Sequence, residues 1–146
     1  MTDQPIARRR SDLAALQAAF RIIRPASPGA EERALDVARF EIEARRRRRR
    51  VFGDDEGLLG DPIWDALLEL FVAHADDRAV STTSLVLAMH LPASTGLRWV
   101  DHMEERGLLT RAIDERDRRR CLIRPTEHAR ALVIEALEPL WRARVG

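Results

Sequence analysis

The sequence predicts a mostly α-helical fold with one small β-hairpin, and three observations support this prediction. Apolar residues recur at helical spacing in several segments, which are separated by breaks rich in Pro and Gly. Two short apolar runs, 108–113 and 121–125, flank a polar turn in the pattern of a β-hairpin. The turn, 114–120, carries four arginines and follows an amphipathic segment at 93–106. A short helix followed by a basic hairpin is typical of a winged helix that binds DNA.

The composition limits the class of protein. With 146 residues, of which 45% are apolar, the chain is long enough for one domain with a sizeable core. No apolar run reaches the roughly 18 residues of a membrane span, and no signal-peptide pattern is present, so we expect a cytoplasmic protein. Cys121 is the only cysteine, which excludes an intrachain disulfide. The net charge of +1 does not by itself favour a nucleic-acid partner.

Two helices are expected in the N-terminal part of the chain. Ser11 can cap the first, which ends near Arg24 before a segment with two prolines and a glycine. The second is expected from about Glu31 to Arg50. Both have apolar faces that must be buried, so we assign residues 1–60 to an N-terminal helical region.

The second helix ends in six consecutive arginines, Arg45–Arg50. At about 100° per residue they surround the helix, and cations at a helix C-terminus suit its dipole. We therefore interpret this run as a solvated helix end. Additional phosphate contacts and the binding of an acidic partner are the alternatives.

Residues 61–125 are expected to form a compact DNA-binding module, and residues 126–146 a C-terminal helix. Short polar caps and turns separate the parts of the module. The expected elements are a helix from Asp61–Pro62 to about His74, a minimal strand at Val80, a helix over 82–90 capped by Ser81, the helix 93–106, the hairpin, and a last helix capped by Thr126.

The helix over 93–106 divides into two faces. Four positions at helical spacing are expected to be buried: Gly96, Trp99, Val100 and Met103. The opposite face carries small, hydroxyl and cationic side chains that suit the wall of a major groove: Ala93, Ser94, Leu97, Arg98 and His102. Gly107 ends the helix where a left-handed residue is wanted.

These motifs resemble the winged-helix regulators of the MarR type. The family pattern of Thr, two variable positions, Arg, two apolar residues and Asp is present as Thr95, Arg98 and Asp101. The wing pattern is present as Asp114-Glu-Arg-Asp117-Arg-Arg. The resemblance covers residues 61–143 and implies a homodimer of winged helix-turn-helix subunits, flanked by N- and C-terminal dimerisation helices, that binds duplex DNA and acts as a repressor. Gly96 departs from the family's β-branched residue, and we expect Trp99 to fill the space that Gly96 leaves.

Nine residues are candidates for DNA contact. In the helix, Arg98 can bind guanine, Leu97 can pack on a thymine methyl, and the hydroxyls can donate to phosphates. In the wing, one or two arginines can reach a minor groove or phosphates, while others pair with Asp114 and Asp117. The structural alternatives are that Ser94 and Thr95 only cap the helix and that Arg98 only pairs with Asp101 or with a neighbour of His102. The candidates are Ser94, Thr95, Leu97, Arg98, His102, Arg116, Arg118, Arg119 and Arg120.

Other functions receive less support from the sequence. Asp61, Asp65 and Glu69 share a helix face, but without a neighbouring histidine they are interpreted as solvated carboxylates rather than metal ligands. No nucleophile with a base is recognisable, so no enzyme and no cofactor is expected. The main alternative is a winged helix that docks protein, which the acidic segment 61–92 favours. A sensor of a small-molecule effector is a third alternative, but no residue pattern in the sequence identifies such a ligand. The sequence also does not identify the DNA operator.

Overall fold

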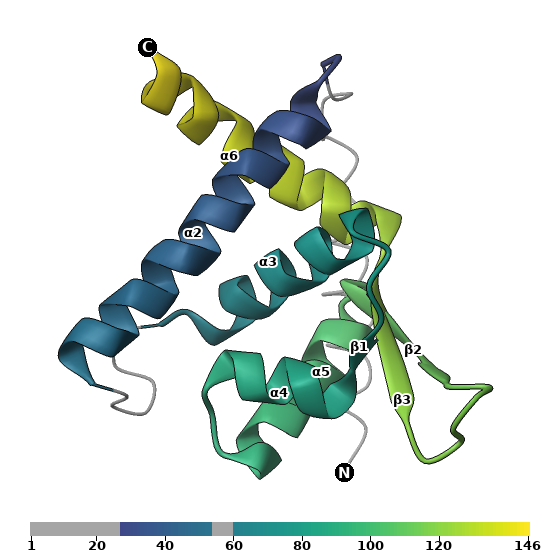
Figure 1. Cartoon of the computed structure of the whole chain (residues 1–146). Helices are drawn as coiled ribbons and strands as arrows, with labels where there is room; N and C mark the ends of the chain where they lie inside the picture. Colours follow the sequence, from purple (N-terminus) through teal and green to yellow (C-terminus); the bar gives the residue numbers. More distant parts are fainter. Residues whose placement is uncertain (1–26, 54–59) are drawn as a thin grey trace, which may run out of the picture.

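The long helices α2 (Ala30–Phe52) and α6 (Glu127–Val145) cross at one end of the molecule, and α3 (Pro62–Ala75) packs against both (Figure 1). The other end is formed by α4 (Thr82–Met89), α5 (Ala93–Glu105) and a small sheet. The computed structural model describes residues 27–53 and 60–146, so the helix expected over 11–24 lies outside the described residues.

The sheet consists of β1 (Val80–Ser81), β2 (Leu109–Ile113) and β3 (Cys121–Pro125). All neighbours are antiparallel, and β3 lies in the middle, so that Val80 and Arg111 pair with the same residue, Ile123, from opposite sides. The minimal strand and the hairpin that the sequence predicts are both confirmed. The hairpin formed by β2 and β3 projects away from the helices (Figure 1).

Two apolar cores share α3. One face of this helix packs with α2 and α6, and the other face packs with α4, α5 and the sheet. A helix with buried residues on both sides is apolar around most of its circumference, as the sequence of α3 is. The α3 residues of the first core are Leu68, Phe71 and Val72, and those of the second are Ala66, Leu70 and Ala73.

Side-chain caps fix where three helices begin, as the sequence predicts. The Asp61 carboxylate accepts a hydrogen bond from the Trp64 amide at 3.4 Å, and Pro62 occupies the first turn. The Ser81 hydroxyl accepts from the Ser84 amide at 3.2 Å. Thr126 accepts from Ala129 at 3.0 Å and also donates to the carbonyl of Gly107 at 2.6 Å. The start of α6 is therefore tied to the end of α5.

The end of α5 directs the chain into the wing. Gly107 has φ +71°, the left-handed conformation that glycine adopts without strain. The amide of Gly107 donates to the Glu104 carbonyl and that of Leu108 to the Met103 carbonyl, which together form a Schellman motif. β2 starts immediately afterwards, so this motif sets the angle between α5 and the hairpin.

Candidate nucleic-acid interface

The face of α5 opposite the core is exposed. Ser94, Leu97, Arg98 and His102 all lie on it, and Leu97 retains 45% of its surface accessible to solvent. Thr95 is half-buried at the edge of this face. The structure therefore brings the five helix candidates together on one side of one helix.

The core side of α5 differs from the prediction at one residue. Gly96, Val100 and Met103 are buried, but Trp99 is 39% exposed and is not part of the buried stripe. Trp99 also does not fill the space above Gly96. That space belongs to Val86 of α4, whose Cγ1 would lie only 2.5 Å from a Cβ placed on residue 96. α4 and α5 thus approach too closely for any larger residue at this position.

Within the described residues, the first turn of α5 has no side-chain cap. Pro92 is the N-cap residue, and none of the described side chains accepts a hydrogen bond from the first amides of the helix. The alternative role of Ser94 and Thr95 as caps is therefore wrong. The amides of Ala93, Ser94 and Thr95 precede the first intrahelical hydrogen bond, from Gly96 to Pro92, and they give this end of α5 the positive potential that suits an anion.

Arg98 forms no hydrogen bond or ion pair with any residue in 27–53 or 60–146. Its expected alternative partner, Asp101, is occupied by Arg111 of β2, whose Nη2 lies 2.7 Å from Asp101 Oδ1. The pairing of Arg98 with Asp101 is therefore wrong, and the Arg98 guanidinium faces solvent in the middle of the exposed face.

Arg111 fastens the wing to α5. Besides Asp101, it contacts Glu104 twice, with Nη2 2.9 Å from Oε1 and Nε 3.1 Å from Oε2. The hydrogen bond from Arg111 lowers the pKa of the Glu104 carboxyl below its ordinary value of 4.5. The same bonds raise the pKa of the guanidinium, so both groups stay charged across the physiological range. The sequence analysis missed this link, because nothing in the sequence pairs β2 with the third turn of α5.

The turn of the wing is shaped by its two aspartates. Asp114 accepts from the Arg116 amide at 2.9 Å, and Asp117 accepts from both the amide and Nε of Arg119, at 3.1 and 3.2 Å. The predicted pairing with Asp117 is confirmed for Arg119, whereas Asp114 binds a main-chain amide instead of a guanidinium. Main-chain bonds between 114 and 120 close the loop.

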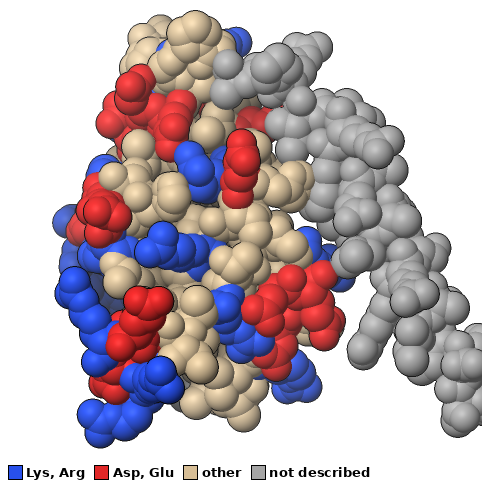
Figure 2. Space-filling model, turned by 90° about the vertical axis from the view of Figure 1, so that its right-hand side faces the viewer, with Lys and Arg blue, Asp and Glu red and all other residues tan. Residues whose placement is uncertain are grey.

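Three wing arginines are left without a side-chain partner among the described residues: Arg116, Arg118 and Arg120. All three are exposed, and the side chain of Arg119 is 92% exposed despite its contact with Asp117. Figure 2, which views the molecule from the side of the hairpin, shows arginine side chains over the lower part of this face, interspersed with acidic ones. The wing therefore presents exposed cations on a loop that its own hydrogen bonds hold in shape.

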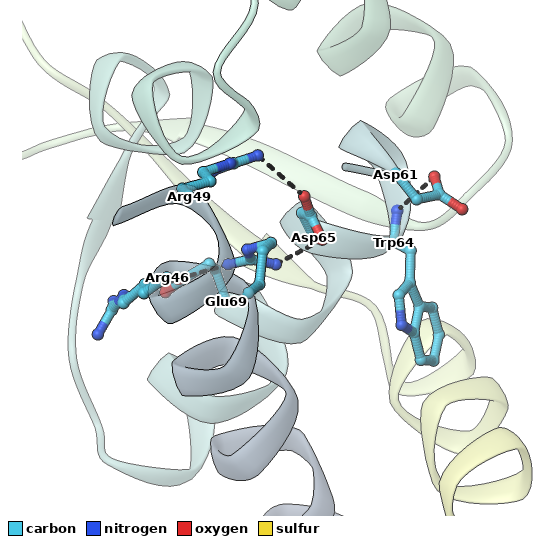
Figure 3. Close-up of polar contacts among 7 residues, drawn as sticks. Arg46, Arg49, Asp61, Trp64, Asp65 and Glu69 are labelled. Carbon is cyan, nitrogen blue, oxygen red and sulfur yellow. Dashed lines mark hydrogen bonds and ion pairs between the residues drawn. The ribbon is translucent and has the colours of Figure 1, made fainter. Parts of the chain in front are cut away.

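A buried ionic cluster joins α2 to α3, and it corrects two predictions. Arg45 and Asp65 are each only 4% exposed, and Arg45 Nη1 lies 2.5 Å from Asp65 Oδ1. Arg45 and Arg46 also contact Glu69, at 3.3 and 3.4 Å. Arg49 Nη2 lies 3.5 Å from Asp65 Oδ2 (Figure 3).

The arginine run is therefore partly a structural feature rather than only a solvated helix end. Asp65 and Glu69 are likewise not solvated carboxylates, and Asp61 caps α3. A signal was present in the sequence: Arg45 and Arg49 are four residues apart, as are Asp65 and Glu69, so each pair shares a helix face. Arg47 and Arg48 are exposed, as expected of a solvated end.

The part of the chain that the structure describes contains neither a metal-binding group nor a membrane-spanning helix. Its His, Cys, Asp and Glu side chains form no group of three that could hold a metal ion. None of its helices combines the length and the apolarity needed to cross a bilayer.

Comparison with known proteins identifies the fold. No protein-family model matches the chain, and no curated protein matches it. Among solved structures, the S. aureus MepR-DNA complex aligns with 75% of this chain and 83% of its own chain, at 16% identity and a TM-score of 0.50. The MarR family transcriptional regulator SPO1453 from Silicibacter pomeroyi DSS-3 aligns over 76% and 74%, at 29% identity and a TM-score of 0.43. The likeness to MepR confirms the predicted MarR-type winged-helix fold.

Proposed function

We propose that this chain is a MarR-type transcriptional regulator that binds duplex DNA. In this proposal α5 enters the major groove, and the wing, 114–120, contacts the neighbouring backbone or minor groove. The observation that carries the proposal is Arg98, which has no partner among the described residues and lies in the middle of the exposed face of α5. The Arg111 link holds this face in a fixed orientation relative to the arginine-bearing wing. MepR, which shares the fold, has been crystallised with DNA, and this supports DNA binding by this chain.

The exposed face of α5 has the chemistry of a DNA-reading surface. A guanidinium can bind guanine O6 and N7 with two parallel hydrogen bonds, and Arg98 is free to do so. Leu97 offers an apolar contact for a thymine methyl. Ser94, Thr95 and the uncapped amides of the first turn can bind phosphate, and His102 lies one turn beyond Arg98 on the same face.

The wing suits a contact that does not depend on sequence. Arg116, Arg118 and Arg120 have no competing partner among the described residues, so their cations are available to phosphates or to a narrow minor groove. Asp117 holds the backbone of the loop and directs Arg119. The aspartates therefore shape the loop without neutralising most of its charge.

We further propose that the functional unit is a homodimer, because two copies of α5 can then address the two halves of a palindromic site. Residues 1–60 and 126–146 would hold the two subunits together, while 61–125 bind DNA, and binding would repress transcription by obstructing the polymerase. Sedimentation of the full chain tests the dimer, since a mass of one subunit at micromolar concentration would contradict it.

The rival function, docking of a protein partner, loses its main support in the structure. That support was the acidity of residues 61–92. Asp65 and Glu69 are bound to arginines of α2, and Asp76 is bound to Arg39, with Nη2 2.6 Å from Oδ1. Three of the five acidic side chains of this segment are therefore paired with arginines of α2, which weakens the case for a basic partner.

Affinity for a labelled duplex of about 30 base pairs, long enough for two half-sites a helical turn apart, tests the proposal. We expect Arg98→Ala to weaken binding about tenfold to a hundredfold, equivalent to roughly 1–3 kcal/mol. Arg78→Ala is the control, because Arg78 is an exposed arginine between α3 and β1, outside α5 and the turn 114–120. Equal affinities for the two variants would contradict the proposal.

A further inference from the structure

We propose that Trp99 is a further DNA-contact residue, and that the flank of α5 turned away from the wing binds the sugar-phosphate backbone of the second DNA strand. This inference rests on the proposed function and extends it to Trp99 and Arg106, which are outside the nine candidate residues.

The two flanks of α5 differ in what they contact. On the wing side, Asp101 and Glu104 are bound to Arg111, so this flank is occupied by the protein's own strand. The opposite flank carries residues at spacings of four, three and four: Thr95, Trp99, His102 and Arg106. Trp99, His102 and Arg106 are exposed, and Thr95 is half-buried.

The geometry of the groove requires contacts on both flanks. An α-helix with its side chains is about 10–12 Å across, and the major groove is about 12 Å wide. A helix inserted there meets the backbone of one strand on each side. The wing contacts the DNA strand on its own side of the groove. The flank with Trp99 therefore faces the other DNA strand.

The side chains of this flank suit a phosphate-sugar wall. The Arg106 side chain has no partner among the described residues, and its cation can bind phosphate. The Trp99 indole presents an apolar ring, which can pack on deoxyribose, and an N–H group, which can donate to a phosphate oxygen. Its ring centroid lies 5.8 Å from that of His102, with the planes tilted by 44°, so His102 supports the ring on the groove side.

The exposure of Trp99 is also unexplained by the fold. The buried residues of α5 are Gly96, Val100 and Met103, and they form its contact with the second core without Trp99. Tryptophan is enriched at interfaces, where its ring meets an apolar group and its N–H a polar one, and Trp99 is left 39% exposed beside an arginine. The neighbouring cations, Arg98 and Arg106, suit a polyanion, and the carboxylate of Glu105 beside them lies 3.9 Å from His102 Nδ1.

The test uses the full chain labelled with 5-fluorotryptophan and observed by fluorine NMR. The chain has three tryptophans, and Trp99→Phe identifies the resonance of Trp99. Trp64 and Trp141 pack against the first core and serve as internal controls. On saturation with a mixed-sequence duplex we expect the Trp99 resonance to shift while that of Trp64 does not, and we expect Trp99→Ala to weaken binding about fivefold or more.

The outcomes separate this inference from the proposed function. If the duplex binds and Arg98→Ala weakens binding, but the Trp99 resonance and the affinity of Trp99→Ala do not change, the inference is wrong and the proposed function stands. If the duplex does not bind at all, the proposed function fails. A Trp99 shift that follows protein concentration without DNA would show that a second copy covers this flank, and it would overturn the inference.

Discussion

Gly96 sets the position of α5 by lacking a side chain. Val86 of α4 occupies the space that a β-carbon would need, with Cγ1 2.5 Å and Cβ 3.3 Å from its ideal position. An alanine would favour the helix by about 1 kcal/mol through its propensity. Because Val86 is itself packed in the core and lies close to this position, the steric cost of the added methyl group is larger than this gain.

We expect Gly96→Ala to lower the free energy of unfolding by about 1 kcal/mol, because overpacking costs roughly 1–3 kcal/mol and the propensity gain returns about 1. For a chain of this size the melting temperature should fall by about 2–4 °C. Calorimetry or urea unfolding measures both.

The double variant Gly96→Ala with Val86→Ala distinguishes the clash from other causes. Removing the two methyl groups of Val86 makes room for the new methyl group. The double variant should therefore lose less free energy of unfolding than the two single variants lose together. A strictly additive result would contradict the steric account.

At the scale of elements, the wing and α5 act as one unit because Arg111 binds Asp101 and Glu104. These groups are exposed enough for the pairs to contribute little to stability, roughly 0.2–1 kcal/mol. Their importance lies in orientation, since DNA must meet α5 and the wing at the same time.

We expect Arg111→Gln to reduce affinity for duplex DNA several-fold while changing the free energy of unfolding by less than about 1 kcal/mol. Arg142→Gln is the matched control, because Arg142 is paired with Glu138 within α6, away from the wing. DNA-binding titrations and urea unfolding of both variants measure the two effects. If both variants bind DNA equally well, the link does not orient the wing.

The Arg111 link also predicts a dependence on pH. The folded pKa of Glu104 is lowered, so the link contributes fully above the ordinary value of 4.5 and is lost as the pH falls through the folded value. The Nε–H resonance of Arg111, which donates to Glu104 Oε2, should therefore stay constant at neutral pH and change only below 4.5. The same titration of Glu104→Gln should lack this transition, and a transition above 4.5 would contradict the assignment.

The cluster between α2 and α3 is a second contact between elements, and here burial makes the charges important. Removing one partner of a buried ion pair leaves the other charge uncompensated, at a cost of about 3–5 kcal/mol. Asp65→Ala should therefore destabilise the chain by about 3 kcal/mol, since Glu69 still contacts Arg45. Arg46→Ala, at a side chain 56% exposed, should change stability by less than about 1 kcal/mol. Thermal unfolding compares the two variants, and equal losses would contradict a special role for the buried pair.

At the scale of the whole molecule, the sequence predicts the parts with local signals well. The caps at Asp61, Ser81 and Thr126, the left-handed Gly107 and the hairpin all depend on residues close together in the chain. The contacts that it missed are long-range. The partners of Arg45 and Arg111 depend on how α2 packs on α3 and how β2 packs on α5. The exposure of Trp99 depends on how closely α4 and α5 pack.

The same distinction applies to the DNA-binding surface. Helical spacing alone places the helix candidates on one face, and the structure confirms the exposure of Arg98. The sequence could not decide which acidic groups neutralise which arginines, because that requires the tertiary arrangement. In the structure, Asp101 pairs with Arg111 and Asp117 with Arg119, while Arg98 stays free among the described residues.

The salt dependence of DNA binding tests the central claim most directly. If α5 and the wing each provide one phosphate contact per subunit of a dimer, the logarithm of the affinity should fall with the logarithm of salt concentration with a slope of about −3.6. Replacing Arg118 and Arg120 by Ala should make the slope shallower, by roughly 0.9 for each phosphate that the variant no longer neutralises. Absence of binding at about 50 mM salt, where phosphate contacts are strong, or the same slope in both proteins, would contradict the claim that this surface binds DNA.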